Sequence, residues 1–196
     1  LAHTQRLTDG LRAEPGCAMI LKGAHIVLGV TGGIAAYKAA DLCSKLIQGG
    51  AEVQVIMTPA ATHFVAPLTF QTLTAHPVSI DTFQLLRDTD MAHIALSAWA
   101  QVLVIAPATA NTIAKLAHGT ADNLVTITAL AARCPVLVAP AMDAGMYEHP
   151  ATQENIRILQ ARGVSFAGPE EGRMASGLVG RGRFVEPVDL LGHIRL

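Results

Sequence analysis

The stretch Val136-Leu137-Val138-Ala139-Pro140-Ala141-Met142-Asp143-Ala144-Gly145-Met146 decides the fold. Its first four residues are apolar and predict a buried strand, which Pro140 ends because proline cannot donate a hydrogen bond to a neighbouring strand. A loop of small residues with two methionines and one carboxylate then follows at the carboxyl end of that strand. Open α/β sheets bind their ligands at this position, so the loop 140–146 is the first candidate site.

Apolar runs of strand length alternate with helical segments on both sides of this stretch. Strands are expected at 25–30, 52–57, 101–106, 135–139 and 164–167, and helices at 34–48, 61–73, 111–117, 124–132, 153–162 and 187–194. Between them we expect a polar connection at 76–90 with a short strand near Val78, a loop with a short helical turn at 91–100, and a long loop at 168–184. The alternation predicts a doubly wound α/β domain, flavodoxin- or Rossmann-like, with a parallel sheet covered by helices on both faces. The loops that follow successive strands should gather at one edge of this sheet.

The composition is unusually apolar. Of 196 residues, 51% are hydrophobic and only 15% are charged, and the mean hydropathy is +0.40. No uninterrupted apolar run reaches the roughly 18 residues of a membrane-spanning helix, so we expect the excess apolar surface to lie in subunit contacts. The net charge of −1 gives no indication of a nucleic acid or an anionic membrane as partner.

The cysteines and the first residues bear on the compartment. Cys17, Cys43 and Cys134 form no C-x-x-C pair, which favours free thiols in a reducing, cytoplasmic setting without a disulfide framework or a metal site. The start lacks a basic segment followed by an apolar one, so no secretory signal is expected. We expect residues 1–18 to be a loose tail or a cloning remnant, and 19–196 to be the domain itself.

Two turns carry the residues expected of a phosphate site. Thr31-Gly32-Gly33-Ile34 links the first strand to a helix, and its backbone N–H groups could approach a phosphate, or it could be a tight turn without a ligand. The segment Ala106–Lys115 places Thr109 and Asn111 at a second helix start, as ordinary caps or as phosphate ligands. Asp122 and Asn123 precede a third helix, as another cap or as polar contacts to the edge of a ring.

Two further features could take part in chemistry. His93 lies among apolar neighbours and is either a structural residue or a general base, because imidazole titrates near neutral pH. The segment 172–183 contains glycines and three arginines, which is typical of a solvated loop or of a cationic flap that closes over an anionic substrate.

Five segments together resemble a known family. Val30–Lys38, Ala92–Leu96, Ala106–Lys115, Pro140–Met146 and Ala175–Arg183 occur in the order found in flavin-dependent cysteine decarboxylases. The resemblance is strongest to the phosphopantothenoylcysteine decarboxylases of coenzyme A biosynthesis, which in many bacteria form the amino-terminal half of a bifunctional protein. It covers residues 20–187.

The resemblance implies an FMN-dependent enzyme that converts 4′-phosphopantothenoylcysteine to 4′-phosphopantetheine through oxidation to a thioaldehyde, loss of CO₂ and reduction. It implies a homotrimer or a multiple of trimers with sites between subunits, and a fused or separate phosphopantothenoylcysteine synthetase. The expected catalytic residues are His93, Asp143 and Ser176. The expected cofactor residues are Thr31, Gly32, Gly33, Ile34, Thr58, Thr62, Ala106, Thr109, Ala110, Asn111, Thr112, Asp122 and Asn123. The expected substrate residues are Met142, Asp143, Met146, Ala175, Ser176, Gly177, Arg181 and Arg183.

This chain departs from the family pattern at two of these positions. The family usually has asparagine where Asp143 stands, and an ionised Asp143 about 4 Å from the substrate carboxylate would cost roughly 4 kcal/mol at an effective dielectric near 20. Asp143 therefore binds substrate in its protonated form, accepts from the substrate amide, or serves a different substrate. The family usually has cysteine where Ser176 stands, and serine is a far weaker acid than a thiol.

These departures leave three functions open. The first is phosphopantothenoylcysteine decarboxylation, which the three arginines of the clamp segment 172–183 favour because the substrate is phosphorylated. The second is a peptide cysteine decarboxylase that releases an enethiol, since related enzymes of that kind lack the clamp cysteine. The third is a flavin-binding regulatory subunit without turnover, against which the presence of His93 argues.

Overall fold

The computed structural model describes residues 21–83, 85–87 and 90–194. Cys17 and the expected tail 1–18 lie outside these residues. Within them, a sheet of five parallel strands has the order β2-β1-β5-β6-β7. Its strands are β1 His25–Val30, β2 Glu52–Met57, β5 Val102–Ala108, β6 Val136–Pro140 and β7 Ser165–Phe166. This is the doubly wound, flavodoxin-like order, in which the direction of winding changes between the first strand and its neighbour β5.

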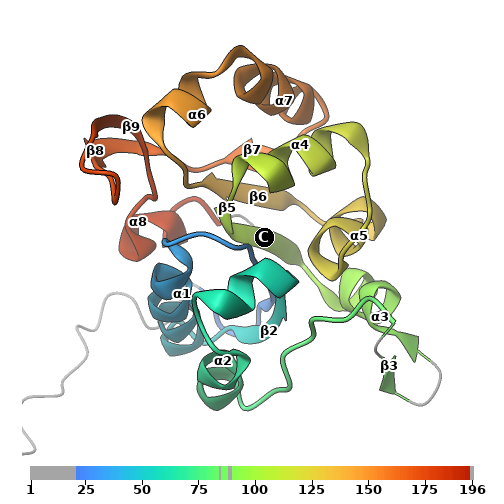
Figure 1. The fold of residues 1–196 in the computed structure, drawn as a ribbon. Coiled ribbons are helices and arrows are strands. Elements are labelled where there is room, and N and C mark those ends of the chain that lie inside the picture. Colours follow the sequence, from blue (N-terminus) through green and yellow to red (C-terminus); the bar gives the residue numbers. More distant parts are fainter. Residues whose placement is uncertain (1–20, 84, 88–89, 195–196) are drawn as a thin grey trace, which may run out of the picture.

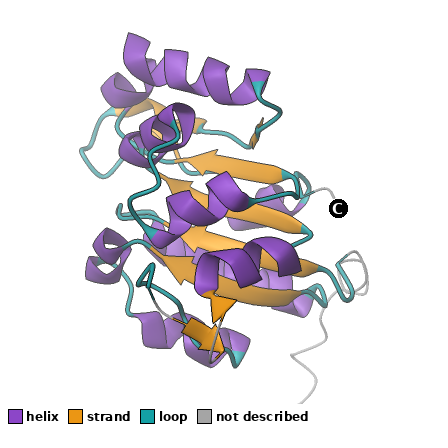
Figure 2. Ribbon diagram, turned by 90° about the vertical axis from the view of Figure 1, so that its right-hand side faces the viewer, coloured by secondary structure: helices purple, strands orange, loops and turns teal. Residues whose placement is uncertain are grey.

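Helices cover both faces of the sheet (Figure 2). The first face carries α1 Ala36–Gln48, α2 Pro67–Thr74 and α8 Pro187–Leu191, and the second carries α3 Ala92–Trp99, α4 Ala110–His118, α5 Leu124–Ala131 and α7 Pro150–Ala161. Strand residues alternate between the two cores, since Ile26 and Leu28 pack on the first face and Val27 packs on the second. Among the described residues, no helix has the length and apolar character needed to cross a bilayer.

Short elements at the carboxyl edge complete the fold (Figure 1). A 3₁₀ helix, η1 Pro59–His63, follows β2, and α6 Ala144–Glu148 follows β6. Two antiparallel hairpins form separate two-stranded sheets: β3 Leu85–Arg87 with β4 Asp90–Met91, and β8 Glu170–Arg173 with β9 Val179–Arg183.

The five predicted sheet strands and the doubly wound class are confirmed, and three of the predicted connections are wrong. Residues 168–184 contain the β8–β9 hairpin instead of a long loop, because the two segments pair with each other and pack against α6. Residues 91–100 form the full helix α3, which buries Ala92 and Leu96. The strand expected near Val78 is a single parallel bridge between Ile56 and Ser79, and the same connection ends in the β3–β4 hairpin.

Candidate functional site

The carboxylate of Asp143 joins the β6–α6 loop to the β8–β9 hairpin. Asp143 is the N-cap of α6, where its Oδ1 accepts a hydrogen bond from the Gly145 N–H at 3.1 Å. Its Oδ2 accepts the hydroxyl hydrogen bond of Ser176 at 2.8 Å. The two positions at which the chain departs from the pattern that it resembles are therefore in direct contact, although they are 33 positions apart in the sequence.

Glycines let the hairpin approach this loop at backbone distance. The Met142 N–H donates to the Gly182 carbonyl at 3.0 Å. A Cβ on Gly182 would lie 2.3 Å from the Met142 carbonyl oxygen, and a Cβ on Gly180 would lie 2.8 Å from the Cβ of Ala144. The segment that the sequence suggested as a flap is thus held against the candidate loop 140–146.

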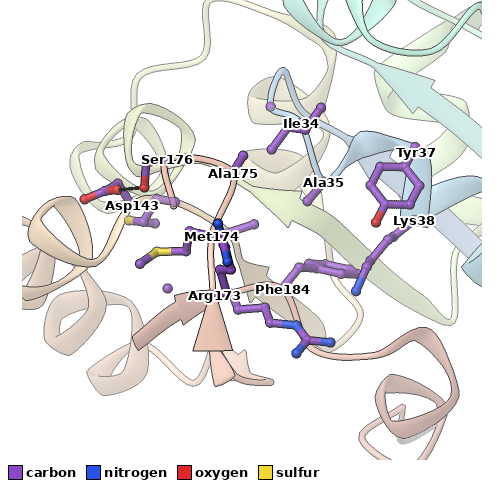
Figure 3. A pocket seen from close by; sticks show the side chains of 15 residues that line it. Ile34, Ala35, Tyr37, Lys38, Asp143, Arg173, Met174, Ala175, Ser176 and Phe184 are labelled. Atoms are coloured by element: carbon purple, nitrogen blue, oxygen red, sulfur yellow. Dashed lines mark hydrogen bonds between the residues drawn. The ribbon is translucent and has the colours of Figure 1, made fainter. Parts of the chain in front are cut away.

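A cavity of about 550 Å³ lies between α1, this loop and the hairpin. Figure 3 shows the Asp143–Ser176 hydrogen bond at one end of the cavity and Tyr37 with Lys38 at the other. Much of the wall between them is apolar, with Ile34, Met174 and Phe184 among its residues. Such a cavity suits a ligand with a polar group at each end and an uncharged middle.

A second cavity, of about 330 Å³, is lined by residues of the same loop. Its lining brings together residues from three of the predicted turns. They are Gly32, Ala60, Thr109, Ala110, Asn111, Thr112, Ala141, Met142 and Met146. Ala141 and Met142 line both cavities, so ligands in the two cavities would meet at this loop.

The side chain of Thr31 fixes the geometry of the second cavity. The buried Thr31 hydroxyl donates to the Pro107 carbonyl at 2.7 Å and accepts from the Thr109 N–H at 3.2 Å. Next to it, a Cβ on Gly32 would lie 2.5 Å from the Cβ of Ala60. The predicted phosphate turns are thereby linked to each other and to the loop after β2.

The start of α4 has the donors that a phosphate group needs. Thr109 caps the helix by accepting from the Thr112 N–H at 3.3 Å. The N–H groups of Ala110 and Asn111 belong to the first turn and have no acceptor within the helix, and both residues line the second cavity. Because Met142 and Met146 add an apolar wall beside this anion-binding helix start, the lining fits a phosphate-bearing cofactor with an apolar ring, such as FMN.

Other residues expected at the cofactor lie outside both linings. The Thr58 side chain caps η1, the Thr62 hydroxyl donates to the Pro59 carbonyl at 2.7 Å, and Ala106 is fully buried in β5. Asn123 caps α5. Their side chains therefore shape the turns around the site.

Asp122 also has a local partner. Its carboxylate accepts a hydrogen bond from the Lys115 ammonium at 2.6 Å, and this bond is the main reason that the pKa of Asp122 is lowered. The structure gives Asp122 a role in holding the α4–α5 connection and places it outside the two cavities.

His93 is separated from the loop and the hairpin. It lies at the start of α3, which Figure 1 shows on the opposite side of the molecule from β8 and β9. Its Nδ1 is buried and has no hydrogen-bond partner among the described residues. One chain therefore does not bring His93 to the cavity that contains Asp143 and Ser176.

Two substrate candidates in the hairpin also lie off the cavity lining. The guanidinium of Arg181 lies over the Tyr147 ring, 5.6 Å from its centroid. Gly177 has a φ of +86°, a left-handed conformation that a turn residue without a Cβ adopts readily. Ala175, Ser176 and Arg183 do line the larger cavity, together with Gly33 and Ile34.

Lys38 lines the larger cavity, and sequence reasoning assigned it no role. Lys38 donates to Glu186 at 2.7 Å, and Arg183 contacts the same carboxylate oxygen. The hydrogen bond from Lys38, followed by that from Arg183, lowers the pKa of Glu186. Lys38 is the last residue of the segment Val30–Lys38, but it lies 148 positions from Glu186 in the sequence. No local pattern reveals such a pair.

Comparison with known proteins identifies the family. The model of the family described as Flavoprotein matches residues 19–195. The chain is 49% identical over 172 residues to the coenzyme A biosynthesis bifunctional protein CoaBC of Bacillus subtilis, which covers 88% of this chain and 42% of that protein. The chain thus spans less than half the length of this relative.

Solved structures of related proteins are also similar to this chain. A PPC decarboxylase with a cysteine-to-serine substitution, complexed with pantothenoylaminoethenethiol, superimposes with a TM-score of 0.80 at 32% identity, over 88% of this chain and 96% of that one. The FMN-dependent cysteine decarboxylase SpaF gives a TM-score of 0.75 at 38% identity, over 82% and 91%. From the match of the family model to nearly the whole chain, together with these likenesses, we conclude that the chain belongs to the Flavoprotein family.

Proposed function

We propose that this chain is an FMN-dependent decarboxylase that converts 4′-phosphopantothenoylcysteine to 4′-phosphopantetheine. The observation that carries the proposal is the pair of cavities that meet at Ala141 and Met142. One has the phosphate-binding helix start of α4, and the other is a long, largely apolar cavity with polar groups at both ends. The names of the relatives, CoaBC and PPC decarboxylase, support the same reaction.

The second cavity is the proposed cofactor site. FMN, when bound there, supplies reversible two-electron oxidation of the cysteine side chain, which makes the carboxylate a leaving group. The chain contributes the first-turn N–H groups of Ala110 and Asn111 for the phosphate, and the methionine side chains of 142 and 146 as an apolar wall. Thr31 holds these turns in register.

The larger cavity is the proposed substrate site. Asp143 and Ser176 form its polar end beside the shared loop, where the cysteine portion of the substrate would lie. The docked hairpin places Ser176 beside Asp143 at this end. Asp143 already accepts from Ser176 and Gly145, so a substrate amide N–H is a compatible third donor.

We also propose that the active site is completed by a second copy of the chain, in a trimer or a multiple of trimers. His93 lies away from Asp143 within one chain, and its buried Nδ1 lacks a partner among the described residues, whereas buried polar atoms are usually hydrogen-bonded. Apolar side chains on α3 and on α5, which packs against it, are exposed, Ile94 by 56% and Leu130 by 64%. Sedimentation equilibrium tests the assembly: three protomers or a multiple is expected, and a monomer at micromolar concentration would refute it.

The same relatives support proposals about the source of the substrate and the location of the protein. Because CoaBC proteins are bifunctional and this chain covers 42% of the length of one of them, we propose a phosphopantothenoylcysteine synthetase, fused or separate, as the source of the substrate. The proposed location is the cytoplasm. Addition of a synthetase with its substrates should then yield 4′-phosphopantetheine in one vessel.

The product of purified protein tests the reaction. After anaerobic incubation with 4′-phosphopantothenoylcysteine, mass spectrometry should find a species lighter by one CO₂ with no net oxidation. A product lighter by one CO₂ and two hydrogens would instead support the enethiol-releasing alternative, which Ser176 favours. An unchanged substrate would leave a flavin-binding protein without turnover.

A further inference from the structure

Lys38, Arg183 and Glu186 form an ion cluster at the wall of the larger cavity. Lys38 is on α1, Arg183 ends β9, and Glu186 precedes α8, so three separate elements meet there. One oxygen of Glu186 accepts from both cations, with Lys38 at 2.7 Å. The Lys38 side chain is only 17% exposed, although lysine is among the residues least often buried.

The hairpin is shaped to place Arg183. A Cβ on Gly172 would lie 2.8 Å from the Cδ of Arg183 and 3.2 Å from its Nη1. The absence of a side chain at 172 therefore lets the arginine stem cross the β8 strand. Glu186 then holds the guanidinium and the Lys38 ammonium side by side.

The charges of the cluster do not cancel. Two cations share one carboxylate, which leaves one positive charge in excess at the cluster. Arg173 on the same cavity lining adds a second positive charge, and the carboxylate of Asp143, at the other end of the lining, offsets one. A phosphate monoester carries about −1.5 to −2 charges near pH 7. The cluster therefore complements this group in charge, and Lys38 and Arg183 can donate to it.

We propose that Lys38 and Arg183, positioned by Glu186, bind the terminal phosphate of the substrate and so make the site selective for a phosphorylated pantetheine chain. The inference rests on the proposed function for the identity of that chain. In Figure 3 Lys38 lies at the end of the cavity away from Asp143 and Ser176. A substrate whose cysteine end contacts Asp143 would thus extend along the apolar wall towards the cluster.

The test compares phosphorylated and unphosphorylated ligands on the flavin-loaded oligomer. Calorimetry measures the binding of 4′-phosphopantetheine, pantetheine and inorganic phosphate to the wild type, Lys38→Gln and Arg183→Gln. Steady-state kinetics measure KM and kcat for phosphopantothenoylcysteine and pantothenoylcysteine. Lys45→Gln is the matched control, because Lys45 is on the same helix but pairs with Asp41. Flavin content and thermal midpoint show that each variant is folded.

Each cluster variant should lose about 10- to 100-fold in affinity for 4′-phosphopantetheine, the size expected for one hydrogen bond to a charged group. The affinity of each variant for pantetheine should not change, and the loss in turnover should appear as a higher KM. Arg183→Lys should recover part of the lost affinity and turnover. Inorganic phosphate that binds as tightly as 4′-phosphopantetheine would show a general anion site and overturn the proposal. Equal losses for both pantetheine ligands, or none, would also overturn it. If no substrate is turned over, the proposed function fails. Calorimetry then still decides whether the cluster binds the phosphate group of 4′-phosphopantetheine.

Discussion

Asp143 and Ser176 form a hydrogen-bonded pair at the polar end of the larger cavity. Where the family pattern has cysteine, the serine hydroxyl is a far weaker acid than a thiol that titrates near 8.5. Restoring the thiol by Ser176→Cys should therefore speed the final protonation and raise the ratio of 4′-phosphopantetheine to enethiol at least about 10-fold. Mass spectrometry of quenched reactions measures this ratio, with Ser176→Ala as the control. An unchanged ratio would show that another group supplies the proton.

The buried thiol of Cys43 is expected to be inert. Burial raises the pKa of Cys43 to about 12, and burial also raises that of Cys134. Because the thiolate is the reactive form, Cys43 should resist iodoacetamide in the folded protein at pH 7 and react once the protein is unfolded in urea. Peptide mass mapping before and after unfolding measures this, and rapid labelling of native protein would contradict the described burial.

The hydrogen bonds of the Thr31 side chain are expected to stabilise the fold. Thr31→Val would leave the Thr109 N–H and the Pro107 carbonyl without their buried partner, and each unsatisfied buried group costs about 1–3 kcal/mol. A loss of about 2 kcal/mol or more in the free energy of unfolding is expected from urea titration, together with weaker FMN retention. Thr72→Val, which alters an exposed bond to the Leu68 carbonyl, should change stability by less than about 0.5 kcal/mol.

At the scale of elements, the hairpin depends on the close approach of β9 to the β6–α6 loop. Gly182→Ala would force the hairpin away, since the new Cβ would lie 2.3 Å from the Met142 carbonyl oxygen. We expect the sheet to remain folded, while amide exchange and proteolysis increase within 174–183 and KM rises. Val179→Ala, at a position 72% exposed, is the control. Equal protection of the hairpin in both variants would contradict the docking.

The elements also show which parts of the fold the sequence could predict. Strands buried on both faces read as apolar runs, and β1, β2, β5 and β6 were found within two residues at each end. The β8–β9 hairpin was not found, because its glycine-rich strands have little intrinsic strand preference. Its pairing and its contact with α6 are tertiary effects that no local pattern shows.

The candidate site likewise contains some features that local sequence patterns predict and others that arise only from tertiary contacts. Gly32, Thr109 and Asn111 were predicted to share a site because they follow parallel strands, and they do line one cavity. The contact between Asp143 and Ser176 and the cluster around Glu186 join segments remote in sequence. No local sequence pattern indicates such contacts.

At the scale of the whole molecule, the separation of His93 from Asp143 predicts complementation between subunits. His93→Asn and Asp143→Ala should each be nearly inactive alone. If each site combines residues from two copies, mixed oligomers formed after dissociation and reassembly should regain roughly a quarter of the wild-type activity for an equal mixture. Activity per mixed oligomer that stays at the level of the single variants would show that each chain carries a complete site.

The proposed function requires that this chain oxidises and decarboxylates a phosphorylated pantothenoylcysteine with its own bound flavin. The most direct measurement is a single anaerobic turnover, in which the flavin-loaded protein is mixed with 4′-phosphopantothenoylcysteine while flavin absorbance and product mass are followed together. We expect bleaching of the oxidised flavin band, loss of CO₂ on the same time course, and return of the band as 4′-phosphopantetheine forms. An absorbance trace that stays flat while the substrate mass remains unchanged would contradict it.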